Sequence, residues 1–579
     1  VWFQATGLRG NMDALQLVSR GRLFQKVWRQ RIGIWLGGVV VWGMTGAAVA
    51  ADFYVAPWGT NRGDGSISNP WNLGYALKGP PAVQPGDTIW MLGGVYRANG
   101  RPTKFYSSLQ GAPNRPITVR QYPGERAIID GSLSQLTGSW VNYRGFEIMN
   151  SMKRRNTLET GPFPRAFWGS DGRGNTTDFA VPGFDLRARR VKLINLIIHD
   201  SIGGGILLST NAVNPELYGN IVYHNGWQGG DRGHGHGLYA QNNAPSVAEV
   251  RDNLFFSNYA LGAQATGTGS LVDNFNIRGN VFFFNSNISR EHQGNLVLGP
   301  FGGNARNITL ARNYFYETQP SGTDVNIGYV GGIVDGLVQE NYFATRVSFS
   351  PNNQNVEVLN NTTVDALDSG KESNVVVVRP NKYEPGRAHV IVYNWQRLPE
   401  VAVDLSNVLV PGTAFEIRSA QNILGPPVVE GEYAGGTVLL PMHGLHVARP
   451  LMANATPATA PRFNVFVVMP RMPPVTQNTP PVLSSIPNQT IEKNSESKAI
   501  PFEVMDAELP PEFLNLSVNS SNPALVPNQN IQFTGARNAR TLKIVPRENR
   551  VGKTSITLTL SDGRLSTTVA FNVTVRESR

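Results

Sequence analysis

Short apolar runs broken by Gly, Asn and Pro follow one another along the chain and predict strands. The runs are rich in Val, Ile and Phe, and no long stretch repeats apolar residues at helical spacing. The clearest pattern is a ragged repeat in which Asn precedes several apolar residues. Its members are "NLIIHD" from Asn195, "NIVYHN" from Asn220, "NLFFSN" from Asn253, "NVFFFN" from Asn280, "NYFYET" from Asn313 and "NYFATR" from Asn341, and "NNTTV" at Asn360 closes the series. The steps of 25 to 33 residues indicate the coils of a solenoid.

A second strand follows in each coil. These strands are "GGILLS" from Gly204, "GLYAQ" from Gly237, "GAQA" from Gly262, "NLVLG" from Asn295, "VNIGY" from Val325 and "VSFS" from Val347. Alternate residues of a strand point into the lumen, and asparagines at a recurring turn can satisfy backbone groups of neighbouring coils. The expected fold class is therefore all-β, with a right-handed parallel β-helix followed by two small β-sandwich domains. A propeller, which needs a longer four-stranded repeat, is the second choice.

The domain boundaries follow from shifts in composition. Residues 1–50 form a leader with a signal peptide from Met12, in which basic residues precede "IGIWLGGVVVWGMTGAAVA" and an A-x-A site before Ala51. A membrane anchor is the alternative for this apolar stretch. The β-helix is expected at 51–375, and an accessory β-sandwich on the end of the solenoid at 376–470. A Pro-rich linker at 471–481 and a second β-sandwich at 482–579 follow.

Charge and cysteine content narrow the class of protein. The net charge is +10, of which +5 falls in the leader, so the remainder is too mildly basic to indicate nucleic-acid binding. The chain has no cysteine, so an exported form must be stabilised by core burial and backbone hydrogen bonds. We expect a secreted or cell-surface protein that is monomeric and has no transmembrane span after signal cleavage.

Three stretches near the expected N-terminus of the β-helix carry a resemblance to a family. "FYVAPWGTNRGDGSISNPWNLGYAL", "VQPGDTIWMLGGVYR" and "RPITVRQYPGERAIIDGS" resemble secreted bacterial β-helix proteins of the pectate-lyase-like superfamily, especially its chondroitinase B and alginate lyase branch. The resemblance covers roughly residues 52–375. It implies the β-helix fold and a polysaccharide substrate. Lyases of that branch use a Lys–Arg pair, often with calcium, but the coils from 195 to 360 contain no lysine.

Titratable residues gather around "DRGHGHGLYAQN", which begins at residue 231. Alignment of the coils places Tyr239 and Gln264 in one outward column, beside a rim of residues that precede the second strands. The candidate catalytic residues are Asp231, Arg232, His234, His236 and Tyr239 on one coil, Glu291 and His292 two coils on, and Asp324 after them. Residues two coils apart lie about 10 Å apart, a span that accommodates a sugar ring.

Several readings of this rim stay open. In β-elimination from a uronate, a neutral His or a Tyr removes a proton while Arg232 or Arg290 neutralises the carboxylate. In glycoside hydrolysis, two carboxylates among Asp231, Glu291 and Asp324 flank the bond. The two histidines could instead bind a metal with Asp231 or His292, or the segment could be only a Gly-rich corner. His199 and His224, at equivalent places after two first strands, are expected to form a structural stack.

The last domain resembles the cadherin-like and immunoglobulin-like modules of bacterial surface proteins. By that resemblance Asp506, Glu508 and Asp562 are candidate ligands of Ca²⁺, although carboxylates in turns are the plainer reading. Together, the sequence predicts an exported carbohydrate-active protein that cleaves a polysaccharide by elimination or hydrolysis. The alternative is a non-catalytic glycan-binding or adhesin-type surface protein.

Overall fold

A computed structural model describes most of the chain after the leader. The described residues are 50–100, 103–152, 155–160, 168–170, 176–178, 182–268, 271–319, 323–367, 372–451, 456–471, 479–507, 511, 514–536, 538–562 and 565–577. The expected signal peptide lies outside them. In the described part of the chain, the helices are one four-residue α-helix, α1 (Leu73–Ala76), and the 3-10 turns η3 (Ala420–Asn422) and η5 (Asn528–Asn530). No helix among these residues has the length and apolarity that a membrane span needs.

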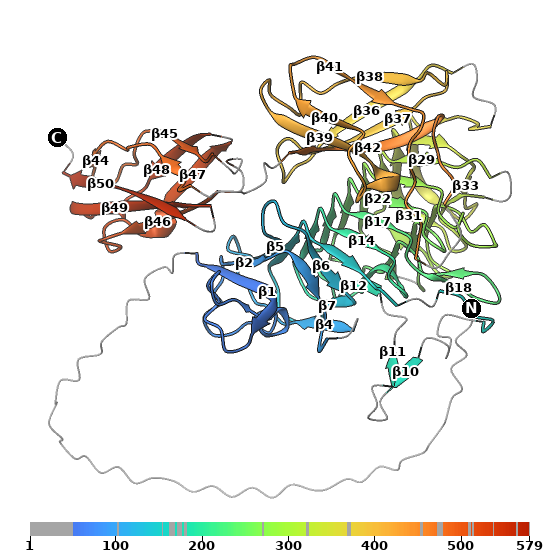
Figure 1. Cartoon of the computed structure of the whole chain (residues 1–579), viewed down its shortest axis with the longest axis horizontal. Helices are drawn as coiled ribbons and strands as arrows, with labels where there is room; N and C mark the ends of the chain where they lie inside the picture. The colour runs from blue at the N-terminus through green and yellow to red at the C-terminus, as the bar shows by residue number, and fades with distance from the viewer. Residues whose placement is uncertain are drawn as a thin grey trace, which may run out of the picture. The chain divides into compact units, whose positions relative to one another are not determined.

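Three parallel sheets form a solenoid, in which each coil supplies a strand to sheet A, then to sheet B, then to sheet C (Figure 1). The 12 strands of sheet A are β1 (Asp52–Thr60), β2 (Thr88–Met91), β5 (Ile117–Gln121), β8 (Val141–Arg144), β13 (Lys192–Ile194), β16 (Glu216–Tyr218), β21 (Ala248–Arg251), β24 (Phe275–Arg278), β27 (Ala305–Arg306), β28 (Thr309–Ala311), β31 (Ile333–Gln339) and β34 (Gln354–Leu359). The 10 strands of sheet B are β3 (Gly94–Tyr96), β6 (Ala127–Asp130), β9 (Glu147–Met149), β14 (Ile197–His199), β17 (Ile221–Tyr223), β22 (Leu254–Phe256), β25 (Val281–Phe283), β29 (Tyr314–Tyr316), β32 (Tyr342–Ala344) and β35 (Thr362–Thr363). The 9 strands of sheet C are β4 (Lys104–Ser107), β7 (Ser132–Gln135), β12 (Pro182–Leu186), β15 (Gly204–Leu208), β20 (Leu238–Ala240), β23 (Ala263–Ala265), β26 (Leu296–Leu298), β30 (Val325–Ile327) and β33 (Val347–Phe349).

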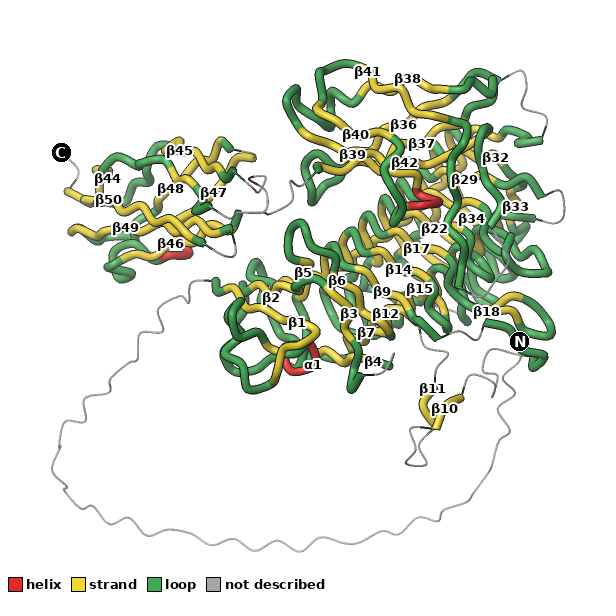
Figure 2. The backbone as a smooth tube through the Cα atoms, viewed as in Figure 1, coloured by secondary structure: helices red, strands yellow, loops and turns green. Residues whose placement is uncertain are grey.

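Mostly antiparallel sheets make up the C-terminal part of the chain, and Figure 2 shows their strands with the connecting loops. The accessory domain contains a five-stranded sheet of β36 (Val375–Pro380), β37 (Ala388–Tyr393), β42 (Phe463–Pro470), β39 (Ala414–Ser419) and β40 (Val429–Glu432), and a pair of β38 (Glu400–Asp404) and β41 (Thr437–Pro441). The last domain has one sheet of β43 (Val482–Leu483), β45 (Ile500–Met505), β48 (Ala539–Ile544) and β47 (Ile531–Ala536). Its other sheet holds β44 (Gln489–Glu492), β50 (Ser566–Arg576), β49 (Gly552–Ser561) and β46 (Asn515–Ser520). The prediction of an all-β chain with a parallel β-helix followed by β-sandwiches is confirmed.

An asparagine ladder holds the turn between sheets A and B. Asn220, Asn253 and Asn280 are fully buried, and each donates its side-chain amide to the amide oxygen of the next asparagine, as do Asn313 and Asn341 in turn. The last acceptor is Asn361. Because these side chains are buried, the ladder satisfies polar atoms that the turn would otherwise leave unpaired.

Two asparagines of the sequence repeat stand outside this ladder. Asn195 and Asn360 have φ angles of 53° and 53°, and they occupy the left-handed position that precedes the ladder position. Leu196 therefore takes the ladder position in its coil and donates its backbone N–H to the side chain of Asn220. Asparagine suits both positions because it tolerates positive φ and hydrogen-bonds in turns. The sequence repeat, which took Asn195 and Asn360 as equivalents of Asn220, was therefore wrong by one residue at its first and last members.

The same offset corrects the expected pairing of two histidines. His199 pairs in register with Tyr223, so His224 has no equivalent histidine one coil before it. His199 lies instead between two buried carboxylates, with Nε2 2.9 Å from Glu147 and Nδ1 2.8 Å from Asp200. His224 contacts Thr456 of the accessory domain through Nε2. The stack of these two histidines was therefore a wrong prediction.

Between β17 and β32, the outward face of sheet B is as apolar as its inward face. Inward residues such as Phe255 and Phe282 join the solenoid core, whereas outward residues such as Phe256 and Phe283 form a second core with residues of the accessory domain, among them Phe463. Runs such as "LFF" and "VFFF" are thus buried on both sides. The accessory domain packs against this side face of the solenoid, which corrects the expectation that it packs on the end.

Candidate functional site

The corner between sheets B and C carries the long insertions of the solenoid. A second, shorter asparagine ladder runs along it, in which Asn225, Asn258 and Asn285 each donate to the next member and Asn285 donates to Asn295. Asn295 donates in turn to Oδ2 of Asp324 at 2.8 Å. The last position of this ladder is therefore occupied by a carboxylate, that of Asp324. The sequence repeat does not predict this second ladder.

Two of the insertions contact one another directly. Arg232 donates to Gln293 at 2.7 Å, and Gln293 donates to the carbonyl oxygen of Gly233 at 2.8 Å. Gln228 contacts Glu291 at 3.4 Å and accepts the backbone N–H of Arg290. The loop around His234 and the segment Glu291–His292 thus lie side by side, as the alignment of the coils predicts.

His234 is buried within the insertion between β17 and β20. Its ring stacks on Trp227 at 5.0 Å between centroids, in the two-stranded sheet of β18 (Trp227–Gln228) and β19 (Gly233–His234). Its Nε2 lies 2.9 Å from Oδ1 of Asp231, and burial lowers its pKa. Asp231 itself is exposed. The pair presents a carboxylate to solvent and keeps the imidazole behind it.

His236 has a different environment, although it lies two residues away. It accepts the backbone N–H of Leu261 through Nδ1 at 3.2 Å, and burial lowers its pKa to about 3. With Nδ1 engaged, the neutral ring carries its proton on Nε2 and acts as a donor rather than as a base. Its ring lies 6.2 Å from that of Tyr239, which pairs in register with Gln264.

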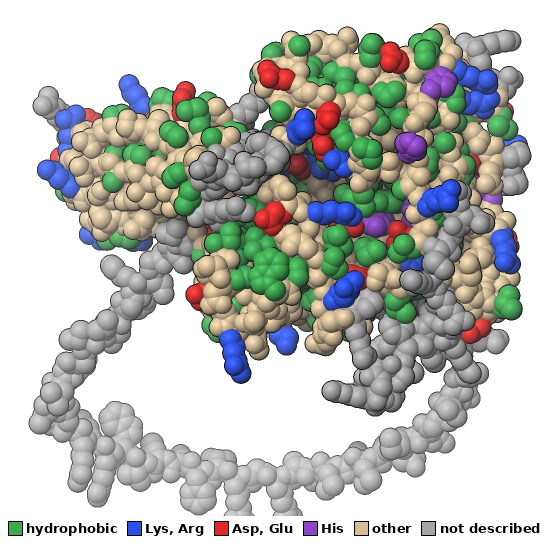
Figure 3. All heavy atoms as spheres, in the orientation of Figure 1, with side chains coloured by type: hydrophobic (Ala, Val, Ile, Leu, Met, Phe, Trp, Pro, Cys, Tyr) green, Lys and Arg blue, Asp and Glu red, His purple; other side chains and the backbone are tan. Residues whose placement is uncertain are grey.

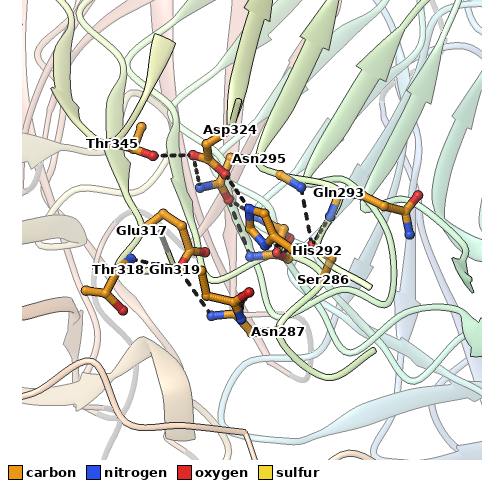
Figure 4. A network of polar contacts seen from close by, with 12 residues as sticks. Ser286, Asn287, His292, Gln293, Asn295, Glu317, Thr318, Gln319, Asp324 and Thr345 are labelled. Carbon is orange, nitrogen blue, oxygen red and sulfur yellow. Dashed lines mark hydrogen bonds and ion pairs between the residues drawn. The ribbon is translucent and has the colours of Figure 1, made fainter. Parts of the chain in front are cut away.

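A cluster of His292, Glu317 and Asp324 lies further along the corner (Figure 4). One potential ligand atom from each residue lies within 4.8 Å of the other two. Glu317 directly follows β29, and it has the place in its coil that His224 has after β17, through the registers of β17, β22, β25 and β29. Glu317 carries no distinctive signal in the sequence, because a glutamate after an apolar strand is most often an exposed loop residue.

The two carboxylates of this cluster are held by neighbouring donors. Oε1 of Glu317 accepts the backbone N–H groups of Thr318 and Gln319 at 2.7 and 3.0 Å. Oδ2 of Asp324 accepts Asn295 at 2.8 Å and Thr345 at 2.9 Å. The second oxygens, Oε2 of Glu317 and Oδ1 of Asp324, are buried and have no hydrogen-bond partner among the described residues.

Burial of two acids beside one imidazole shifts the pKa values of Glu317 and His292. Burial and then repulsion from Asp324 raise the pKa of Glu317 to about 7. Burial lowers the pKa of His292, but its contacts with Asp324 and Glu317 raise that pKa overall. Two carboxylates that share a dry site cannot both ionise without a compensating positive charge.

The outward face of sheet C carries polar and aromatic side chains beside this corner. One column, defined by the strand registers, runs through Asp185, Leu207, Tyr239, Gln264, Val297, Asn326 and Ser348. The carboxylate of Asp185 accepts two hydrogen bonds from Arg187, at 2.9 and 3.0 Å. The row thus combines polar side chains and the ring of Tyr239 with the apolar Leu207 and Val297.

A pocket of about 490 Å³ opens at the first strand of sheet C. Its lining includes Lys78, Arg97, Lys104 and Tyr106, whose ring is 56% exposed. The β4 strand that lines this pocket and the β20 strand that carries Tyr239 are four steps apart in the sheet. At about 4.8 Å per step, the pocket lies roughly 19 Å from Tyr239 along sheet C.

The remaining candidate residues have less distinctive surroundings. In the last domain, Asp562 accepts the backbone N–H of Leu565 at 2.6 Å, in the turn between β49 and β50. This is the contact of a turn carboxylate. Glu508 lies outside the described residues. Charged side chains are dispersed over the visible face of the molecule in small groups of both signs, with no single basic patch on that face (Figure 3).

Comparisons with known proteins support the fold. A family model described as a right-handed β-helix region matches residues 128–282, and the solenoid is therefore a right-handed parallel β-helix. A comparison with curated proteins found no match. Among solved structures, the chain is similar to a rhamnogalacturonan lyase, with 16% identity, a TM-score of 0.33, and coverage of 54% of this chain and 87% of that chain. It is also similar to pectate lyase Pel9A, with 14% identity, a TM-score of 0.31, and coverage of 54% and 80%.

A third similar structure is a mannuronic acid specific polysaccharide family 6 lyase from human gut microbiota. It shares 13% identity, a TM-score of 0.25, and coverage of 55% of this chain and 84% of that chain. Likenesses at this level of identity and TM-score carry no argument about activity. The chemistry of this chain has to be argued from its own residues.

Proposed function

We propose that the protein is an exported carbohydrate-active β-helix protein that binds an acidic polysaccharide along sheet C and cleaves it beside β20. The observation that carries the proposal is the row of polar and aromatic side chains on the outward face of sheet C, next to the insertions that hold Asp231, Arg232 and Glu291. The outward face of sheet B between β17 and β32, in contrast, is apolar and packs against the accessory domain. The leader supports export.

The basic residues favour an acidic glycan. Arg187 lies beside the sheet C column, bonded to Asp185, and Arg232 lies at the corner; both side chains are partly exposed, at 46% and 35%. Lys78, Arg97 and Lys104 line the pocket at β4. Guanidinium groups bind carboxylates through paired hydrogen bonds, so these basic residues favour uronate residues along the part of sheet C between β4 and β20.

The chemistry that fits these residues best is β-elimination. This reaction needs a base near the proton beside the carboxylate, and a cation that neutralises the carboxylate while the carbanion forms. Tyr239, half-buried and directed outward, is the candidate base, and Arg232 the candidate cation. His236 would support the site as a hydrogen-bond donor, since its acceptor nitrogen is engaged by Leu261.

Hydrolysis is a second candidate, favoured by two exposed carboxylates. Asp231 and Glu291 come from the two insertions that contact each other, and Gln228 bonds to Glu291. A pair of this kind can supply a general acid and a base or nucleophile on either side of a glycosidic bond.

A screen of the full chain against uronate-containing and neutral polysaccharides tests the proposal. Ultraviolet absorbance of an unsaturated sugar identifies elimination, and new reducing ends without that absorbance identify hydrolysis. For elimination, Tyr239→Phe should lower kcat at least about 100-fold with little change in melting temperature, because general base catalysis contributes about 10²–10⁴-fold. Tyr329→Phe, at another partly exposed tyrosine, is the matched control. Binding without any product would support the non-catalytic alternative, and neither binding nor product would overturn the proposal.

A further inference from the structure

We propose that His292, Glu317 and Asp324 form a binding site for one divalent transition-metal cation of the zinc type. The cluster combines one imidazole and two carboxylates, whose potential ligand atoms lie within 4.8 Å of one another. The inference does not rest on the proposed function. It concerns binding of a cation by the free protein.

The separation of the ligand atoms fits a shared cation better than a direct ion pair. Nε2 of His292 and Oδ1 of Asp324 are 3.6 Å apart, which is longer than a normal N–H···O hydrogen bond. Two ligands of a tetrahedral zinc ion, each at about 2.0–2.2 Å from the metal, are about 3.4 Å apart. The observed distance is therefore close to the separation of two ligands that share one such cation.

The buried oxygens supply a second, independent observation. Glu317 and Asp324 are only 4% and 3% exposed, yet Oε2 of Glu317 and Oδ1 of Asp324 have no hydrogen-bond partner among the described residues, and Oδ1 has only the 3.6 Å contact with Nε2 of His292. A buried unpaired carboxylate oxygen costs free energy. Figure 4 shows both carboxylates directed toward the region of His292. A cation between them would satisfy both oxygens at once.

Neighbouring groups orient each ligand as they do in metal sites. Nδ1 of His292 lies 3.3 Å from Oγ of Ser286, an arrangement that leaves Nε2 free to bind. The other oxygens of Glu317 and Asp324 are occupied by backbone and side-chain donors. Donors on the far side of each ligand fix its orientation and typically affect metal affinity 10- to 100-fold.

The ligand types decide which cation fits. Calcium prefers six to eight oxygen ligands, whereas imidazole suits zinc and its first-row neighbours. The described cluster offers one nitrogen and two carboxylates. We therefore expect Zn²⁺ to bind more tightly than Ca²⁺, with further positions filled by water.

Titration calorimetry with the untagged, EDTA-treated full chain tests the site, with ZnCl₂, MnCl₂ and CaCl₂ as the probes. We expect one Zn²⁺ per chain, and at least a 100-fold loss of affinity in Asp324→Asn and in Glu317→Gln. Glu291→Gln, an exposed carboxylate beside His292, should keep the affinity, and so should His234→Ala. Circular dichroism checks that each variant is folded. Cobalt replacement adds a readout, since tetrahedral Co²⁺ absorbs strongly in the visible range and the signal should vanish in both carboxylate variants.

Three results would overturn the inference. These are absence of Zn²⁺ binding to the folded chain, equal binding by both carboxylate variants, or a preference for Ca²⁺. Because no polysaccharide is present, a failed glycan screen would leave this result unaffected, and a failed titration would leave the glycan proposal standing.

Discussion

Removal of one ladder asparagine should destabilise the solenoid far more than removal of an exposed one. Oδ1 of Asn280 accepts two hydrogen bonds from Asn253, one from the backbone N–H at 3.0 Å and one from the side-chain amide at 2.9 Å. Its own amide donates to the carbonyl oxygen of Val250 at 2.8 Å and to Asn313 at 3.0 Å. Asn280→Ala therefore leaves two donors of Asn253 and the carbonyl of Val250 without these partners in a dry turn.

The magnitude follows from the cost of buried unpaired groups. Each group left unsatisfied costs about 1–3 kcal/mol, and partial relaxation reduces the sum, so we expect a loss of about 3–6 kcal/mol. A domain of about 325 residues unfolds with an entropy near 0.7 kcal/mol/K, so the melting temperature should fall by about 4–9 °C.

Differential scanning calorimetry of the full chain measures this shift in the transition of the solenoid. The matched control is Asn243→Ala, at an exposed position after β20, where the melting temperature should change by less than about 1 °C. The reasoning would be refuted if Asn280→Ala and Asn243→Ala shifted the transition equally. A small shift in Asn280→Ala would mean that water replaces the lost partners.

Two further predictions concern buried contacts of sheet B. Burial lowers the pKa of His199, but Asp200 and Glu147 raise it overall to about 9, and their own pKa values are lowered, so the network should stabilise the fold most between about pH 4.5 and 6.5. The difference in melting temperature between the wild type and His199→Gln should therefore decrease above pH 6.5 toward pH 9 and also in acid. A difference that does not depend on pH would contradict this prediction. The ring of Phe256 stacks between those of Tyr223 and Phe283, with centroid distances of 5.0 and 4.7 Å, so Phe256→Ala should lower the free energy of unfolding in denaturant by about 3–5 kcal/mol. Phe301→Ala, at an exposed position, should lower it little, and equal losses in the two variants would contradict the prediction.

Much of the candidate site could be placed from the sequence, but not its chemistry. Alignment of the coils put Tyr239 and Gln264 in one column, and it brought the loop around His234 to the segment Glu291–His292. The sequence did not predict how far these side chains are exposed to solvent. His234 lies behind Asp231 and against Trp227, because the insertion folds back as a short hairpin whose path no repeat specifies. Glu317 was missed because its burial depends on neighbouring coils.

The sequence by itself determined that the chain forms a solenoid, because strand alternation and the recurring asparagines are local patterns repeated in every coil. It could not tell which asparagines pair, since the left-handed position at Asn195 and the ladder position at Asn220 favour the same residue type. Only the tertiary structure decided what covers the apolar outer face of sheet B. Runs such as "LFF" require burial on both sides, but burial is non-directional, and any apolar surface of matching shape can provide it. The accessory domain provides it here through contacts such as that of Phe283 with Phe463, more than a hundred residues apart in the chain.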